Sequence, residues 1–140
     1  MRTLGLALLV AGLAALPASA RTSRVDTVTA TVHKTGHSGT SLVYTGIVHS
    51  KVFGRGRVTE YVAGNLTGRL IIRYAKGTVR GKTVAHVKHA GGNGVDVYGT
   101  YRLTGGSGRY KHIRGHGSFT GHSSPSLQTA TFRQHGRASY

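Results

Sequence analysis

The sequence contains no cysteine and only three acidic residues among its 140 positions. Without cysteine, the chain can form neither a disulfide nor a lipid anchor on a cysteine thiol, so an exported domain must rely on its hydrophobic core. The acids are Asp26, Glu60 and Asp96. Glycosidase chemistry needs two carboxyl groups at a defined separation, and so few acids disfavour it.

A long hydrophobic run is also missing, except at the N-terminus. Arg2 precedes the apolar stretch Leu4–Leu16, Pro17 ends that stretch, and Ala18-Ser19-Ala20 matches a small-residue cleavage site. This pattern predicts a secretory signal peptide over residues 1–20. The alternative, a membrane anchor, is disfavoured because the run is shorter than the roughly 20 apolar residues a span requires. We therefore expect a secreted, soluble, single domain over residues 21–140, with no membrane span.

Negative charge is scarce, and positive charge is abundant. The chain has 19 lysines and arginines, nine histidines and a formal net charge of +16. Such a field attracts anionic polymers, including nucleic acids and polymers of the cell envelope. The alternative is an arginine-rich surface that keeps the protein soluble without any specific partner.

Residues 21–140 show no helical apolar stripe, and short alternating segments separated by glycine-rich turns recur instead. Eight such segments predict an all-β fold, a small eight-stranded antiparallel β-barrel in which closure removes exposed strand edges. The expected strands are Val25–His33, Ser41–His49, Lys51–Val62, Thr67–Ala75, Thr78–His89, Val95–Thr104, Arg109–Gly121 and Leu127–Gln134.

The segment Gly99–Gly121 is the strongest β signal, because two alternating runs flank the sequence Gly105-Gly106-Ser107-Gly108. It predicts a hairpin with a tight turn. Within the second run, Gly115 and Gly117 share a face with Phe119, whereas the histidines and Arg114 occupy the other face. We expect the glycine face to line the barrel interior, where strands must coil sharply.

Three segments carry a family resemblance: KGTVRGK (Lys76–Lys82), GTYRLTGGSGRY (Gly99–Tyr110) and GHGSFTG (Gly115–Gly121). They resemble the allene oxide cyclase-like and dirigent-like barrel superfamily, with Ser107 and Tyr110 in place of its usual threonine and phenylalanine. The composition favours a bacterial secreted member. The resemblance implies an eight-stranded antiparallel barrel that is often trimeric in the plant cyclases, so a homo-oligomer is expected here.

Few residues are suited to catalysis. The related enzymes line a barrel pocket with polar groups that include carboxylates, and Glu60 is the candidate that could point inward here. In a basic protein, we expect a lone carboxylate to act as an ion-pair partner rather than as a catalytic group. No cofactor is predicted, and no metal site, because lysine and arginine surround the paired histidines and no cysteine completes a ligand set.

Two kinds of binding residue remain. Tyrosine and phenylalanine could line a pocket for a small hydrophobic ligand, as small barrels can hold one. The pocket candidates are Tyr74, Tyr98, Phe119 and Glu60. The candidates for binding an anionic polymer are Arg69, Arg73, Arg80, Lys82, Arg102 and Arg109. The sequence thus favours a non-enzymatic binding or envelope-associated protein, with two alternatives: an isomerase or cyclase acting on a small hydrophobic substrate, and a polyanion-binding module.

Overall fold

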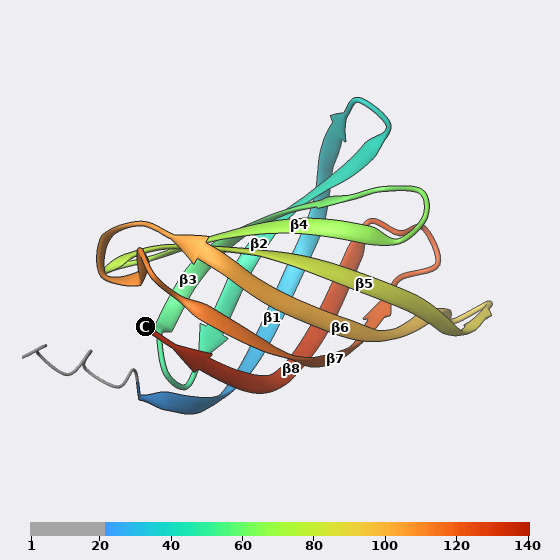
Figure 1. Cartoon of the computed structure of the whole chain (residues 1–140). Helices are drawn as coiled ribbons and strands as arrows, with labels where there is room; N and C mark the ends of the chain where they lie inside the picture. Colours follow the sequence, from blue (N-terminus) through green and yellow to red (C-terminus); the bar gives the residue numbers. More distant parts are fainter. Residues whose placement is uncertain (1–21) are drawn as a thin grey trace, which may run out of the picture.

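The computed structural model describes residues 22–140, so the predicted signal peptide lies outside the described residues. These residues form a closed barrel of eight antiparallel strands, each paired with its neighbours in sequence, and β8 pairs with β1 to complete the ring (Figure 1). The predicted fold class is confirmed. The strands are β1 (Ser23–Ser38), β2 (Ser41–Ser50), β3 (Gly54–Val62), β4 (Thr67–Tyr74), β5 (Gly77–Gly91), β6 (Gly94–Gly106), β7 (Arg114–Ser123) and β8 (Thr129–Ser139).

Alternation along each strand separates interior from exterior side chains. On β4, Leu70, Ile72 and Tyr74 are buried, whereas Arg69 and Arg73 are exposed. The same period of two places the buried Phe119 of β7 in the barrel, with Gly115 and Gly117 on its face. The interior prediction for β7 is therefore confirmed.

The predicted tight turn between β6 and β7 is wrong. Strand β6 continues to Gly106, and a short 3-10 helix, η1 (Gly108–Tyr110), follows before β7 begins at Arg114. The longer connection lets Tyr110 and Ile113 turn inward, where they are 3% and 0% exposed. Burial of these two side chains favours the longer loop over a tight hairpin turn.

Other predicted strand limits also differ, and β1 runs to Ser38, five residues beyond the expected His33. Strand β3 starts at Gly54 because residues 51–53 form a turn, and β8 runs five residues further than expected, to Ser139. In the β2–β3 turn, the Ser50 hydroxyl accepts hydrogen bonds from the amides of Val52 and Phe53 at 3.1 and 2.9 Å. These bonds use amides that a continuous strand would offer to its neighbour.

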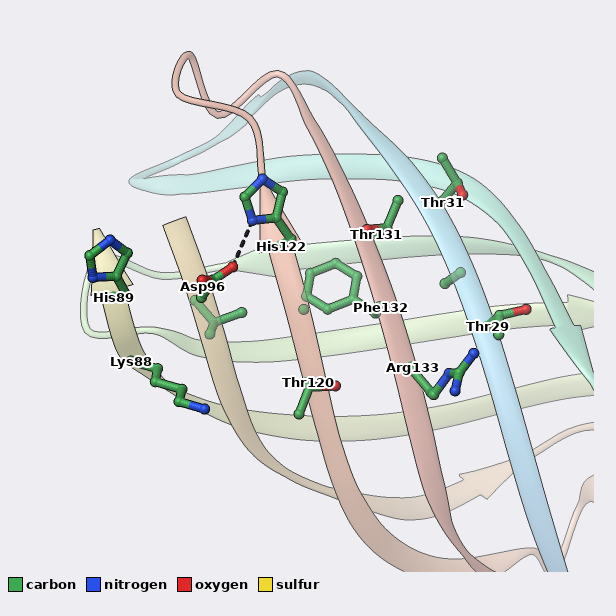
Figure 2. Close-up of a pocket in the computed structure, with 13 residues that line it drawn as sticks. Thr29, Thr31, Lys88, His89, Asp96, Thr120, His122, Thr131, Phe132 and Arg133 are labelled. Carbon is green, nitrogen blue, oxygen red and sulfur yellow. Dashed lines mark hydrogen bonds and ion pairs between the residues drawn. The ribbon is translucent and has the colours of Figure 1, made fainter. Parts of the chain in front are cut away.

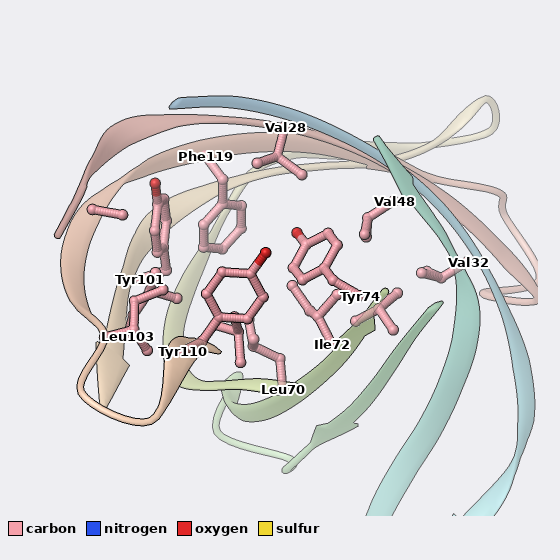
Figure 3. Packing of buried hydrophobic residues seen from close by; sticks show 14 of the residues in the cluster. Val28, Val32, Val48, Leu70, Ile72, Tyr74, Tyr101, Leu103, Tyr110 and Phe119 are labelled. Atoms are coloured by element: carbon pink, nitrogen blue, oxygen red, sulfur yellow. The ribbon is translucent and has the colours of Figure 1, made fainter. Parts of the chain in front are cut away.

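The barrel has two unlike ends. The closed end carries the loops 51–53, 75–76 and 107–113 together with the C-terminus (Figure 1). Here the ring of Phe53 lies 5.3 Å from Tyr74, 5.0 Å from Tyr110 and 5.3 Å from Tyr140, as measured between ring centroids. These rings cap the buried aliphatic cluster, part of which is shown in Figure 3. The closed end is thus filled by side chains.

Glycine makes room for one of these rings. A Cβ atom at Gly117 would lie 2.7 Å from the Tyr101 hydroxyl and would meet the backbone oxygen of His135. Its cross-strand partner is Gly136, where a Cβ atom would meet the same hydroxyl. The pair therefore allows β7 and β8 to pass close beneath Tyr101.

The opposite end, called the open end below, carries the loops 39–40, 63–66, 92–93 and 124–128. Several of its interior positions hold short side chains, including Val62, Ala85, Val97 and Ala130. Among the described residues, no helix is long and apolar enough to cross a membrane.

Candidate ligand cavity

The open end contains a cavity of about 300 Å³. Its walls come from the interior faces of β2, β3 and β5–β8, with Leu66 and Leu127 at the rim, and most of its surface is aliphatic or aromatic. Short side chains at several interior positions leave this space, whereas aromatic rings fill the closed end. Its size and apolar lining match those of small-molecule sites in barrel mouths.

Glu60 and Thr83 form the polar floor of the cavity. The Thr83 hydroxyl donates a hydrogen bond to the Glu60 carboxyl over 3.2 Å. Gly68 leaves space for this pair, because a Cβ atom there would lie 3.1 Å from Glu60 Oε1 and closer still to Thr83 Oγ1. Glu60 also borders a void of about 20 Å³ that extends toward the closed end. The carboxyl therefore lies deep in the barrel, and its half-buried state reflects exposure to the cavity.

Burial raises the pKa of Glu60 above its ordinary value of 4.5, and the hydrogen bond from Thr83 opposes this shift more weakly. Removing a carboxylate from water destabilises its charged form, and an apolar cavity provides little compensation. Glu60 is therefore protonated over a wider pH range than an exposed glutamate. In the protonated state it can donate a hydrogen bond to a ligand, and in the ionised state it can accept a proton.

Tyr44 links the floor to the rim. It lies directly across the β2–β3 pair from Glu60, and its hydroxyl donates to the Leu127 carbonyl oxygen over 2.9 Å. Burial raises the pKa of Tyr44, and the charge of Glu60 raises it further. Tyr44 therefore remains a neutral donor that holds the β7–β8 loop over the cavity.

The two rim leucines have an unusual backbone. Leu66 and Leu127 have φ angles of +64° and +59°, the left-handed region that disfavours side chains other than glycine, asparagine and aspartate. Each is fastened to the barrel, Leu66 through the amide of Ala85 at 3.0 Å and Leu127 through the Tyr44 hydroxyl. The fold tolerates this local strain where it sets an apolar side chain at the mouth, and strain of this kind clusters at functional sites.

The four predicted pocket residues separate in the structure. Glu60 and Phe119 line the cavity, whereas Tyr74 lies in the aromatic cap of the closed end. Tyr98 lies outside the barrel, 48% exposed, with its ring 5.4 Å from that of His86. It is therefore not part of this cavity, because Val97 and Gly99 occupy the inward positions on either side of it.

Most residues that line the cavity were not among the sequence candidates, and four of them make its floor, its rim or the link between the two: Thr83, Tyr44, Leu66 and Leu127. Thr83 had a detectable signal, since it is a hydroxyl residue on the otherwise apolar face of β5. Tyr44 shares an interior register with Val48 on β2. The rim leucines carry no such signal, because their backbone conformation depends on the surrounding loops.

A second interior carboxyl lies at the closed end. Asp26 is 4% exposed, accepts a 2.7 Å hydrogen bond from the Ser50 hydroxyl and a 3.2 Å bond from the Val52 amide. Burial raises the pKa of Tyr101 to about 12, and the charge of Asp26 contributes to this shift. Two donors from the β2–β3 turn therefore satisfy Asp26, and the contacts are those of a structural anchor.

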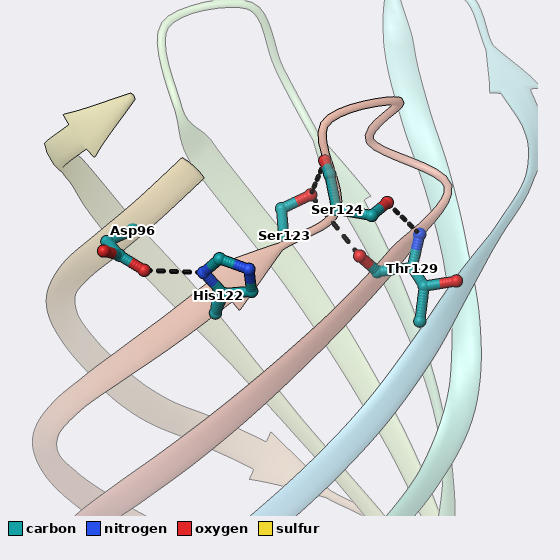
Figure 4. Close-up of polar contacts among 5 residues, drawn as sticks. All are labelled: Asp96, His122, Ser123, Ser124 and Thr129. Atoms are coloured by element: carbon teal, nitrogen blue, oxygen red, sulfur yellow. Dashed lines mark hydrogen bonds and ion pairs between the residues drawn. The ribbon is translucent and has the colours of Figure 1, made fainter. Parts of the chain in front are cut away.

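A second hollow is a groove of about 570 Å³ on the outside of the barrel, across β5–β8 and β1 (Figure 2). There Nδ1 of His122 lies 2.6 Å from Oδ1 of Asp96, and this hydrogen bond lowers the pKa of Asp96 (Figure 4). Both side chains are about half exposed. Because the groove is open to water, we regard the enclosed interior cavity as the stronger candidate.

Most of the predicted anion-binding residues lie on the outer face. Arg69, Arg73, Arg80, Lys82 and Arg102 are exposed on β4, β5 and β6. Arg109 is separate from them, because it lies in η1 with its guanidinium 5.8 Å from the centre of the Tyr140 ring.

Comparisons of this chain with protein-family models, curated proteins and solved structures found no significant match.

Proposed function

We propose that this protein is a non-enzymatic binding protein that holds a small, largely apolar ligand in the open-end cavity. The observation that carries the proposal is the cavity itself, about 300 Å³ of mainly apolar space with a carboxyl and a hydroxyl at its floor. The side chains that line a cavity of this size make fewer packing contacts with the protein than those of a filled core. A ligand that fills it would recover those contacts.

The polar floor indicates which ligands fit best. A molecule with an apolar body and one terminal hydrogen-bonding group would place that group against Glu60 and Thr83. The body would contact Val97, Phe119 and Phe132. Ligands with a permanent negative charge are disfavoured, because the charge would approach the Glu60 carboxyl. With the predicted signal peptide, the site of action would be outside the cell or at its envelope.

The test is binding of N-phenyl-1-naphthylamine, a neutral fluorophore that brightens in apolar surroundings. We expect saturable binding that changes little with added salt. Ala85→Phe places a ring in the cavity and should abolish binding. Val84→Phe is the matched control, because Val84 is the next residue on β5 and is 44% exposed on the outside. Binding that survives Ala85→Phe would contradict the proposal.

One observation favours a second candidate, an isomerase-like activity. Glu60 is a carboxyl of raised pKa in an apolar cavity, and general acid–base catalysis is most efficient when the pKa lies near the working pH. In this role the Glu60 carboxylate would remove a proton from a carbon next to a ligand carbonyl. The same carboxyl would return a proton to the resulting enolate, so atoms and charge balance without a redox partner.

This second candidate can be tested with 2-tetralone in D₂O, by following exchange of its α-protons by NMR. An active Glu60 should accelerate exchange above the buffer rate, and Glu60→Gln should remove the acceleration while fluorophore binding remains. Equal exchange in the two proteins would remove the isomerase candidate and leave the binding proposal standing.

A further inference from the structure

The outer surface carries a continuous row of basic residues that crosses five strands. Arg69 on β4 is the cross-strand partner of Lys82 on β5, and Lys82 is the partner of Arg102 on β6. Arg102 is opposite His116 on β7, and His116 is opposite Arg137 on β8. All five side chains are exposed. We call these five residues the basic row.

No acidic side chain neutralises the basic row. The chain has three acids, and all of them lie among the described residues. Asp26 is buried at the closed end, Glu60 faces the interior cavity, and Asp96 is hydrogen-bonded to His122. Like charges directly opposite each other in a sheet lower its stability. The basic row is therefore a surface whose charge remains available to an external anion.

Neighbouring positions widen this surface. Arg73 lies four residues from Arg69 and Arg80 lies two residues from Lys82, each on the same outer face of its strand. Arg57 is the cross-strand partner of Arg73. The strands around a barrel lie about 4.8 Å apart, so side chains repeat at roughly that interval along the row, and four of its five members are lysine or arginine. Arginine can bind carboxylate or sulfate through two parallel hydrogen bonds. The arrangement suits a linear polymer with an anionic group on successive units.

The shape and chemistry of the row distinguish between kinds of polymer. Single-stranded nucleic acids are held by exposed rings on which bases stack, together with a basic groove. The ring at the end of the row, Tyr61, already lies beneath Arg69, whose guanidinium carbon is 4.8 Å from the ring centre. The row also lies on the convex outside of a barrel, with no element that projects into a groove of duplex DNA.

We propose that the basic row binds a linear anionic polysaccharide, a role independent of the interior cavity. The sugar chain would follow the row across β4–β8, with its carboxylate or sulfate groups against Arg69, Lys82 and Arg102. The interaction is electrostatic, so affinity falls steeply with added salt.

The test uses a heparin decasaccharide as the probe and calorimetry at two salt concentrations as the measurement. The triple variant Arg69→Gln, Lys82→Gln, Arg102→Gln should bind at least about tenfold more weakly, with a flatter salt dependence. The matched control removes three exposed cations away from the row, Lys51→Gln, Arg55→Gln and Lys88→Gln. The affinity of this control variant for the decasaccharide should stay within about threefold of that of the natural protein. Circular dichroism checks that each variant is folded.

Two results would overturn the proposal. Equal weakening by both triple variants would mean that net charge alone attracts the polymer. Tighter binding of an oligothymidylate with the same number of charges would assign the surface to nucleic acid. Should the first triple variant fail to fold, the single change Arg137→Gln at the end of the row replaces it, and unchanged decasaccharide affinity would then count against the row.

Discussion

Asp26 and Glu60 are both carboxyl groups inside the barrel, yet their surroundings differ. Asp26 at the closed end receives hydrogen bonds from a serine hydroxyl and a backbone amide, and packed aromatic rings lie nearby. Glu60 receives one hydrogen bond, from Thr83, and borders an apolar cavity. A buried polar group with all its partners stabilises a fold, whereas one that borders unfilled space is available to a ligand. The comparison assigns a structural role to the closed end and a binding role to the open end.

The largest effect should come from removing the closed-end carboxyl. Asp26→Ala leaves the Ser50 hydroxyl without its acceptor and removes one of the two acceptors of the Val52 amide. We expect a loss of about 3 kcal/mol in the free energy of unfolding. Glu60→Ala should cost less than about 1 kcal/mol, because only the Thr83 hydroxyl loses a partner. Urea denaturation at pH 7 measures both. Similar losses at the two positions would erase the distinction between the ends.

A pair of valines sharpens the same comparison with apolar side chains. Val79 at the closed end is 1% exposed, whereas Val97 borders the cavity. Val79→Ala should destabilise the protein by about 2 kcal/mol, because a new void forms in packed surroundings. Val97→Ala enlarges an existing space and should cost less than about 1 kcal/mol. Urea denaturation midpoints measure the difference, provided that the dependence of the unfolding free energy on urea concentration is unchanged. A loss of stability at Val97 as large as that at Val79 would mean that the open end is equally well packed.

The pH dependence of stability should distinguish Glu60 from its glutamine variant. Because the pKa of Glu60 is raised in the folded state, the folded protein binds the proton more tightly than the unfolded chain does. This contribution is fully present below the unfolded pKa and is lost as pH rises through the folded pKa. Glu60→Gln stays neutral, so its stability relative to the natural protein should increase from pH 4 to pH 8. A relative stability that is constant over this range would contradict the assigned burial of the carboxyl.

The smallest effect on stability is expected at the rim. Leu127→Gly relieves the left-handed backbone but removes an apolar side chain that is 40% exposed. These effects oppose each other, so the free energy of unfolding should change by less than about 1 kcal/mol. Binding of N-phenyl-1-naphthylamine should nevertheless weaken, because the mouth loses an apolar contact. Unchanged binding would mean that the leucine does not contribute to the cavity.

Much of the barrel could be predicted from the sequence, because alternation with a period of two identifies the face of each residue. On β4 this period puts Leu70, Ile72 and Tyr74 on one side and the arginines on the other. The inward position of Tyr110 was missed, since a 3-10 segment depends on the core it covers, whereas Ile113 lies on the expected interior face of Gly115, Gly117 and Phe119. Tyr98 was grouped with interior tyrosines although it lies three residues from Tyr101, and an odd spacing puts the two on opposite faces.

The candidate sites were less predictable than the strands. The two-residue alternation along a strand predicts which side chains face outward. The basic row, however, depends on the registers between strands, which bring Arg69, Lys82 and Arg102 into line. Likewise, the cavity depends on which interior positions share a level of the barrel. Such relations across strands are set by turn lengths and bulges, including the register shift between Arg80 and Gly81, which local patterns do not encode.

The most direct test of the cavity assignment is a carbon-13 NMR titration of the Glu60 carboxyl, with and without bound N-phenyl-1-naphthylamine. Glu60 is the single glutamate of the chain, so its side-chain carboxyl signal needs no assignment by mutation. The account predicts a pKa above the ordinary 4.5 and a change in the Glu60 signal when the fluorophore binds. A pKa at or below 4.5, with no response to the bound fluorophore, would contradict it.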